Sequence, residues 1–251
     1  MKNKVFLFCG LLSVAFLLSS CNYSNKKLLQ KRLENMQRAS KTPVSVEEIK
    51  SAINKYDEES SEVVKKNSQV GIWYKILGTR YIDKKMYGEA LECFEKSLEY
   101  YPENPNLYYY IGRCAAAMSR TVFENDMYRD PKKKQSYLKM CEESYIQALQ
   151  LDPRYSTVLY SLGVLYTYGA IPGEIGLNEP EKAIPYLLRF LEIETKDTSG
   201  MFALARAYAV TGSYEKAVEM YDKIISITKS AQIKADAEAN KKQVLDASYG
   251  L

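Results

Sequence analysis

The sequence contains no histidine among its 251 residues. Histidine is the side chain whose ordinary pKa lies closest to neutrality, so its absence excludes histidine triads, imidazole acid–base chemistry and His-ligated zinc. Excess charge is also small, because 35 Lys and Arg residues oppose 31 Asp and Glu residues. A formal net charge of +4 argues against nucleic-acid binding by bulk electrostatics. A content of 46% hydrophobic and 12% aromatic residues instead predicts a folded core.

Sequence motifs of catalysis are missing as well. The chain has no glycine-rich phosphate loop, no Cys-x-x-Cys pair and no Ser–Lys constellation in a recognisable context. Its carboxylates fall at the spacing of ion pairs on exposed helix faces, as Glu89 and Glu92 do. We therefore expect a non-catalytic protein with no cofactor and no metal site.

Residues 1–20 have the pattern of an export signal. Lys2 and Lys4 precede an apolar run over residues 5–18, which is shorter than the ~20 residues that a membrane-spanning helix needs. The sequence at positions 18–21, Leu-Ser-Ser-Cys, resembles the bacterial lipobox. In that family the cysteine thiol receives a diacylglycerol and the chain is cut before it, which implies lipidation of Cys21.

This resemblance implies an exported protein, held on a bacterial membrane by its lipid and facing the periplasm. Acyl chains contribute ~0.8 kcal/mol for each buried methylene, so two or three chains on one residue give stable anchoring. Position 22 is Asn, not the aspartate that resembles an inner-membrane retention signal in some bacteria, and this favours the outer membrane. The alternative is an ordinary secretory signal followed by a cysteine.

Cys93, Cys114 and Cys141 remain after the signal region. An odd number of cysteines outside the cytoplasm argues against a disulfide framework. Each lies on the apolar face of an expected helix, where cysteine packs as a small hydrophobe. A bond between Cys93 and Cys114 is the alternative.

The body of the chain contains four copies of one pattern: a large residue, Leu-Gly or a variant of it, Tyr or Ala, and then a small and a large residue on a second helix. Pro102 and Pro153 end the first two copies, and Thr195 and Lys229 stand at the ends of the other two. The small residue on the first expected helix is Gly78, Gly112, Gly163 or Ala205, and the one on the second is Ala90, Cys141, Ala183 or Ala217. This pattern resembles the tetratricopeptide repeat.

The spacing supports the resemblance. Gly78 and Gly112 are 34 residues apart, which is the period of the repeat, and the next two intervals are 51 and 42. The surplus residues fall between the Tyr of the first helix and the Ala-type residue of the second. We therefore expect inserted loops at 119–135 and 169–179, at equivalent hairpin turns. Such loops are often binding elements, and the alternative is a tolerated insertion without function.

The resemblance implies an all-α fold, a right-handed superhelical array of helix–turn–helix hairpins with a capping helix at each end. The expected divisions are a signal peptide (1–20), a lipid tether (21–44), an N-terminal capping helix (45–70), four repeats over 71–230 (71–104, 105–155, 156–197 and 198–230) and a C-terminal capping helix (231–251). Ser45 and Glu48 form a capping box that predicts a helix to about Lys66, with Ile49, Ile53 and Tyr56 on its apolar side.

In this family the first helix of each hairpin lines a concave surface. Carrying the pattern over gives a candidate partner-binding groove of Lys75, Asn106, Tyr109, Arg113, Tyr160, Tyr168, Phe202 and Arg206. Four-residue spacing predicts that Arg113 stacks on Tyr109 and Arg206 on Phe202. Such pairs combine apolar area with a guanidinium fork for carboxylates. The lysines and asparagines of the family's carboxylate clamp are not reproduced, and the alternative is that the tyrosines only bridge neighbouring helices.

These expectations favour a scaffold that binds other envelope proteins or their peptide segments and not nucleic acid. The alternative is an accessory protein that handles a small ligand and pairs with the solute-binding protein of a tripartite transporter. A continuous apolar channel would favour the second function, and a shallow polar groove would favour the first.

Overall fold

The computed structural model describes residues 45–59, 69–124, 130–168 and 176–249. Within these ranges the chain forms helices and no strand, which confirms the predicted all-α class. None of the helices in the described part is long and apolar enough to cross a membrane. The chain divides into two compact units, Met1–Leu107 and Tyr108–Leu251.

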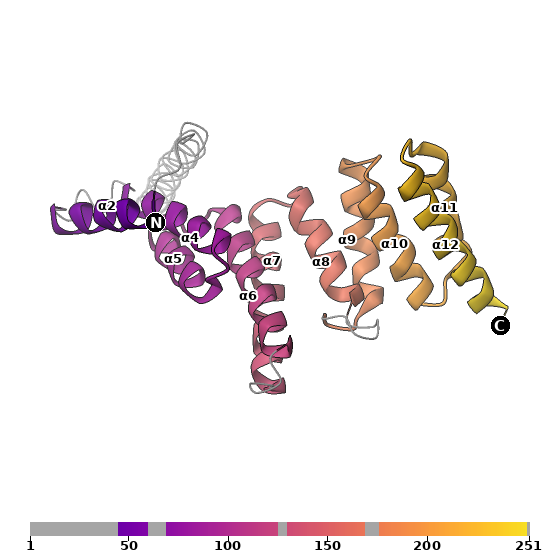
Figure 1. Cartoon of the computed structure of the whole chain (residues 1–251), viewed down its shortest axis with the longest axis horizontal. Helices are drawn as coiled ribbons and strands as arrows, with labels where there is room; N and C mark the ends of the chain where they lie inside the picture. Colours follow the sequence, from indigo (N-terminus) through magenta and orange to yellow (C-terminus); the bar gives the residue numbers. More distant parts are fainter. Residues whose placement is uncertain (1–44, 60–68, 125–129, 169–175, 250–251) are drawn as a thin grey trace, which may run out of the picture. The chain divides into compact units, whose positions relative to one another are not determined.

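The first unit contains a helix hairpin and a preceding helix. α4 (Gln69–Asp83) and α5 (Tyr87–Tyr100) pack against each other, and α2 (Val46–Glu59) packs on α4 (Figure 1). Ser97 Oγ on α5 donates a hydrogen bond of 2.8 Å to the carbonyl of Gly71 on α4, and both residues are buried. This bond fixes the register of the two helices because it joins residues 26 apart in sequence.

The capping box predicted at the start of α2 is present. The amide of Ser45 donates to Glu48 Oε2 at 2.9 Å, and the amide of Glu48 donates to Ser45 Oγ at 3.2 Å. Ile49 and Ile53 are buried, as expected for the apolar side. The side chain of Tyr56 and the predicted extension to Lys66 lie outside the described residues, as do the signal peptide and the tether.

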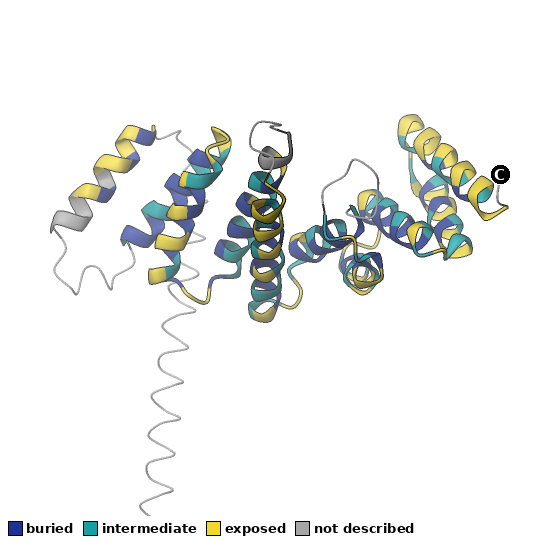
Figure 2. Ribbon diagram, turned by 90° about the horizontal axis from the view of Figure 1, so that it is seen from below, coloured by how far each residue is buried: buried dark blue, intermediate teal, exposed yellow. Residues whose placement is uncertain are grey.

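The second unit contains the remaining helices in chain order. They are α6 (Pro105–Glu124, of which the first turn precedes the unit boundary), α7 (Pro131–Leu151), α8 (Ser156–Tyr168), α9 (Pro180–Ile193), α10 (Thr198–Val210), α11 (Tyr214–Ile227) and α12 (Ala231–Ser248). Consecutive helices pack together from α7 to α12. The α7–α8 contact is smaller than the others and is matched in extent by the contact between α8 and α10. Most residues of α12 are exposed and polar, as expected for a helix that closes an array (Figure 2).

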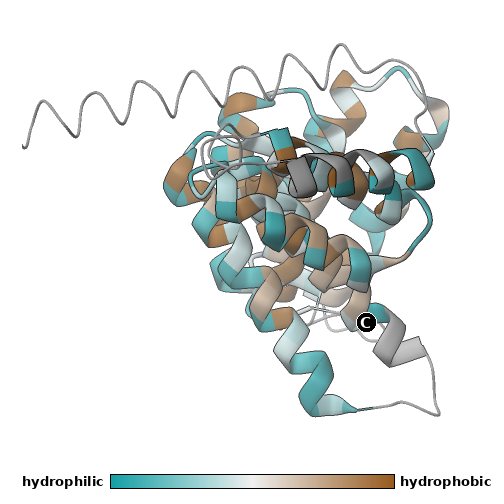
Figure 3. Cartoon of the chain, turned by 90° about the vertical axis from the view of Figure 1, so that its left-hand side faces the viewer, coloured by the Kyte–Doolittle hydropathy of each residue, from teal (hydrophilic) through white to brown (hydrophobic). Residues whose placement is uncertain are grey.

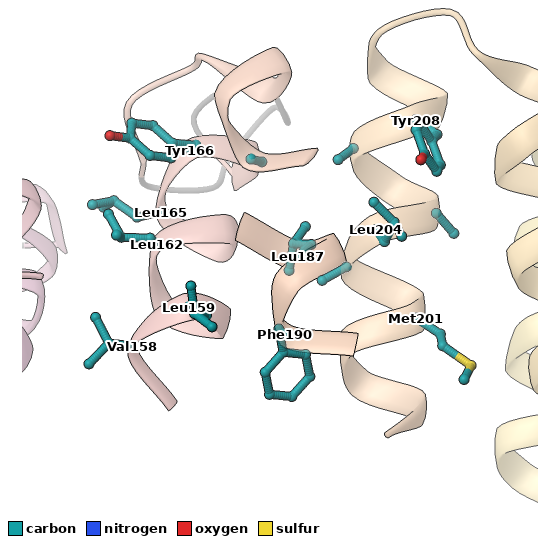
Figure 4. Packing of buried hydrophobic residues seen from close by; sticks show 14 of the residues in the cluster. Val158, Leu159, Leu162, Leu165, Tyr166, Leu187, Phe190, Met201, Leu204 and Tyr208 are labelled. Carbon is teal, nitrogen blue, oxygen red and sulfur yellow. The ribbon is translucent and has the colours of Figure 1, made fainter. Parts of the chain in front are cut away.

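In three hairpins a glycine on the first helix meets a large side chain on the second. A Cβ built on Gly78 would lie 2.8 Å from the ring of Phe94, and one built on Gly163 would overlap Leu187. The buried side chains of α8, α9 and α10 interdigitate around these contacts (Figure 4). Apolar and polar residues alternate around individual helices, so the apolar side of each can face its neighbours (Figure 3).

Three of the hairpin turns, those after α4, α8 and α10, share a closing geometry that tolerates insertion. Lys85, Asn178 and Gly212 all have positive φ, of 59°, 56° and 75°, and each lies five residues before the small residue of its second helix. The next residue along donates its amide to the carbonyl of the first-helix tyrosine, as Met86 does to Tyr81 at 2.9 Å. The equivalent pairs are Ser213 with Tyr208 at 2.8 Å and Glu179 with Tyr166 at 3.0 Å. The extra residues of the third repeat are therefore accommodated before the closing bond, which remains intact.

The insertion at 119–135 is not the loop that the sequence predicted. α6 continues to Glu124 and α7 begins at Pro131, so only residues 125–130 lie between the two helices. The side chain of Asp130 caps α7 by accepting from the amides of Lys132 at 2.9 Å and Lys133 at 3.2 Å, and Pro131 occupies the first turn. Both helices of the second hairpin are therefore elongated, to 20 and 21 residues against 13 and 14 in the third.

The small-to-large contact predicts a difference between two glycine substitutions. Gly163→Ala should lower the free energy of unfolding by about 1–3 kcal/mol, because the added methyl overlaps Leu187. Gly88→Ala is the matched control: Gly88 lies in the first turn of α5, its Cβ would meet nothing within 4 Å, and alanine should stabilise the helix by up to about 1 kcal/mol. Denaturant unfolding followed by circular dichroism measures both changes. Equal effects of the two substitutions would contradict the packing described.

Candidate functional site

The residues predicted for the groove do not all remain accessible. Lys75, in the first unit, is 1% exposed and therefore offers no surface to a partner. Its position on α4 is enclosed by packing, which the repeat pattern alone could not indicate. Asn106 is half-buried in the first turn of α6, where its backbone amide donates to Asn104 Oδ1 at 3.0 Å. The lipidation residue Cys21 lies outside the described residues.

The first predicted arginine–aromatic pair is present on α6. The guanidinium of Arg113 lies 5.6 Å from the ring centroid of Tyr109 and 5.9 Å from that of Tyr110. Tyr109 also contacts the rings of Tyr145, at 6.2 Å, and Tyr155, at 5.6 Å. The tyrosine therefore bridges helices, as the alternative interpretation expected, while Arg113 remains exposed beside it.

The second predicted pair is replaced by a contact between repeats. Arg206 on α10 lies over the ring of Tyr168 on α8, 5.3 Å from its centroid. Phe202 contacts Tyr221 on α11 instead, with ring centroids 5.9 Å apart. The prediction from four-residue spacing was wrong in its partner because α8 and α10 pack side by side and bring the Tyr168 ring to Arg206.

A pocket of about 350 Å³ opens beside these residues, between α6, α7 and α8. Tyr160, Val164 and Tyr168 line it from α8; they are four residues apart and so share one face of the helix. α6 contributes Ala116, Ser119 and Arg120, and α7 contributes Leu138, Cys141 and Tyr145. A volume of this size lies at the lower end of the range for ligand sites, roughly 300–1,000 Å³. The pocket can accept one large side chain of a partner.

Two polar contacts hold the walls of this pocket in place. The hydroxyl of Tyr166 on α8 donates to Glu142 Oε1 on α7 at 2.6 Å. Burial and this carboxylate raise the pKa of Tyr166, so its hydroxyl stays protonated and remains a donor. From α9, Arg189 Nη2 donates to the carbonyl of Pro153 in the α7–α8 turn at 2.6 Å. The first contact joins α8 to α7, and the second joins α9 to the turn between α7 and α8.

Arg120 is a site residue that the repeat pattern missed. It is exposed and lies seven residues, or two helical turns, after Arg113 on the same face of α6. Because the sequence analysis predicted a loop from residue 119, it did not place Arg120 on the same helix as Arg113. A predicted helix that ended at residue 124 would have placed both arginines on one face.

Cys93, Cys114 and Cys141 are buried and form no disulfide, so the Cys93–Cys114 bond considered above is not present. Cys141 lies at the floor of the pocket but is fully buried. Burial raises the pKa of the thiols of Cys93 and Cys141 to about 12. Both are therefore almost entirely protonated at neutral pH and poor nucleophiles.

This burial predicts that the thiols resist a disulfide reagent. A chain that begins at Asn22 should not react with dithionitrobenzoate while folded, and all three cysteines should react in guanidinium chloride. Tyr249→Cys is the control, because Tyr249 is 76% exposed and a thiol there should react at once. Rapid modification of the folded, unsubstituted chain would contradict the burial of Cys141.

Comparisons with known proteins agree with the repeat pattern. Two segments, residues 72–104 and 199–230, match family models described as tetratricopeptide repeat. A TPR repeat-containing protein of Borreliella burgdorferi is 23% identical over 241 residues, which cover 96% of this chain and 92% of the relative.

Solved structures agree at the level of the fold. The structure of YrrB, described as a TPR protein with an unusual peptide-binding site, has a TM-score of 0.53 at 21% identity and covers 77% of this chain and 85% of its own. TTC0263, a TPR protein of Thermus thermophilus, has a TM-score of 0.51 at 18% identity, and the match covers 88% of this chain and 98% of TTC0263. MamA of Desulfovibrio magneticus RS-1 has a TM-score of 0.53 at 14% identity, and the match covers 72% of this chain and 96% of the MamA chain. The predicted helical repeat fold is confirmed.

Proposed function

We propose that this chain, a tetratricopeptide repeat protein by its helix hairpins and repeat matches, is a non-catalytic scaffold of the bacterial envelope. The observation that carries the proposal is the surface formed by α6, α8 and α10 in the second unit. There, an exposed arginine and half-buried tyrosines line a pocket that can accept a partner side chain, and two further arginines lie over tyrosine rings. We call this surface the arginine–tyrosine face and define it by Arg113, Arg120, Tyr160, Tyr168, Phe202 and Arg206.

The face has the composition of a protein-binding surface. Aromatic residues and arginine are enriched where interfaces have their strongest contacts. Tyr160, Tyr168 and Phe202 are half-buried, so each offers part of its ring to a partner while the rest is fixed by packing. Tyr160 is held by the ring of Phe190 at 5.3 Å, and Phe202 by that of Tyr221. Such preorganised side chains lose little conformational entropy on binding.

We further propose that the scaffold is a lipoprotein. The basic start, the short apolar run and the Leu-Ser-Ser-Cys sequence support export and lipid attachment at Cys21. Asn22 supports a position on the outer membrane, facing the periplasm. The acyl chains would then hold the repeats close to the membrane, where partners in the envelope are accessible.

Ligand handling for a tripartite transporter is a second proposal, supported by the pocket between α6, α7 and α8. The lining includes the hydroxyls of Ser119 and Ser161 and the guanidinium of Arg120, together with tyrosine rings. A mixed lining suits a peptide side chain with polar flanks better than a small apolar ligand. The lining therefore favours the scaffold function.

The lipoprotein proposal predicts that one thiol carries the lipid. Cys21→Ala should abolish incorporation of an alkynyl palmitate in growing bacteria and release the protein from the membrane fraction. Cys93→Ala, which changes a buried thiol, should retain both properties. Labelling and membrane association that survive Cys21→Ala would refute anchoring through this residue.

The scaffold proposal predicts that charge reversal on the arginine–tyrosine face removes partners. Crosslinking in intact cells, affinity capture and mass spectrometry would compare the wild type with Arg113→Glu plus Arg206→Glu. The matched control is Lys132→Glu plus Lys133→Glu, which reverses the same charge on exposed residues at the start of α7. Circular dichroism would establish that all three chains fold alike.

We expect the arginine variant alone to lose its specific partners, because buried charged contacts at interfaces are costly to reverse. Loss in the lysine variant alone would place the contact on the elongated hairpin instead. Identical capture by all three chains would contradict the proposed surface, and capture of a solute-binding protein would support the transporter alternative.

A further inference from the structure

The helices of the arginine–tyrosine face have an unusual charge composition within the described residues. α8 carries no Asp, Glu, Lys or Arg, and the single charged residue of α10 is Arg206. On α6 the charged residues are Arg113, Arg120 and, at its last position, Glu124. The face is therefore cationic although the whole chain has a formal net charge of only +4. A surface of this sign attracts carboxylates.

Two of the arginines are oriented before any partner arrives. Arg206 lies over the ring of Tyr168, and Arg113 lies over the rings of Tyr109 and Tyr110. Stacking on a ring face leaves the N–H groups at the edge of the planar guanidinium directed to the side, where they can donate to a carboxylate in a fork. Pre-ordering of these long side chains reduces the entropy lost on binding.

Two carboxylates near the face have contacts of their own. Asp197 caps α10 by accepting from the amide of Gly200 at 2.7 Å. Glu142 accepts from Tyr166 at 2.6 Å. These carboxylates support the helices and the pocket wall. Arg120 and Arg206 supply the positive charge of the face beside the pocket.

The pocket lies between these two arginines. Arg120 lines it from α6, while Tyr168, which carries Arg206, lines it from α8. The rings of Tyr160 and Tyr168 and the side chain of Val164 give it an apolar wall along one face of α8. A cationic group on each side of a recess with one apolar wall is complementary to an apolar side chain with acidic neighbours.

We propose that the arginine–tyrosine face binds an extended acidic segment of a partner protein, whose one large apolar side chain enters the pocket and whose flanking carboxylates contact Arg120 and Arg206. This inference rests on the proposed scaffold function and specifies the chemistry of its partner. It uses Arg120 and one arginine stacked on a tyrosine, Arg206, in place of the lysine and asparagine clamp that the family resemblance would imply.

Selection of random linear peptides displayed on phage tests the specificity directly. The target is the chain beginning at Asn22, and parallel selections use Arg120→Glu plus Arg206→Glu, Val164→Trp and Ala116→Phe. The last two substitutions fill the pocket from opposite walls, so one remains informative where the other disturbs folding. Lys242→Glu, on an exposed position of α12, is the control for a change of charge.

We expect the wild type and Lys242→Glu to enrich peptides in which a Phe, Leu, Trp or Met is flanked by Asp and Glu. A selected peptide, synthesised with a fluorophore, should bind by anisotropy with a Kd that rises roughly tenfold or more in the double arginine variant, as loss of charge-assisted hydrogen bonds requires. Binding should also weaken with added salt. Either pocket-filling substitution should weaken the same peptide without altering the effect of salt.

Other outcomes would overturn the proposal. Enrichment of neutral or basic peptides would reject this specificity. So would acidic peptides that bind the arginine and pocket variants as tightly as the wild type. Neither result bears on the scaffold function, which the capture experiment tests separately. Absence of any enriched peptide would reject the specificity as well. If capture in cells also finds no partner that depends on Arg206, both proposals fail.

Discussion

The structure depends on the close approach of two helices at one small residue in each hairpin. Gly78, Gly112 and Gly163 face Phe94, Tyr145 and Leu187, and a Cβ at any of these glycines would press on the opposite side chain. This contact sets the spacing of the hairpin and buries the large residue. The arginine–tyrosine face lies beside these contacts on α6, α8 and α10, where its aromatic rings are half-buried and two of them are held by neighbouring rings.

The two longer repeats keep this contact while adding residues at the hairpin turn. In the third repeat the amide of Glu179 still closes the turn on Tyr166, as Met86 does on Tyr81. In the second, both helices are longer, and the extra turn of α6 carries Ser119 and Arg120 into the lining of the pocket. Lengthening a hairpin thus changes the binding surface without disturbing the core.

Much of the fold could be predicted because its determinants are local in sequence. The spacing of Gly163 and Ala183 and the capping box at Ser45 identify helices and their pairing. The site was less predictable, since it depends on packing between helices. Lys75 is buried, and Arg206 contacts Tyr168, because of how neighbouring helices pack. The spacing of residues within one helix does not encode such contacts.

The most direct test of the account is photocrosslinking from the surface itself. A benzoylphenylalanine at Tyr160, on the wall of the pocket, would be compared in living cells with one at Leu188, which is 43% exposed on α9. We predict that Tyr160 yields a discrete crosslinked partner and Leu188 does not. Crosslinks to the same protein from Leu188, with none from Tyr160, would show that partners bind elsewhere on the repeats.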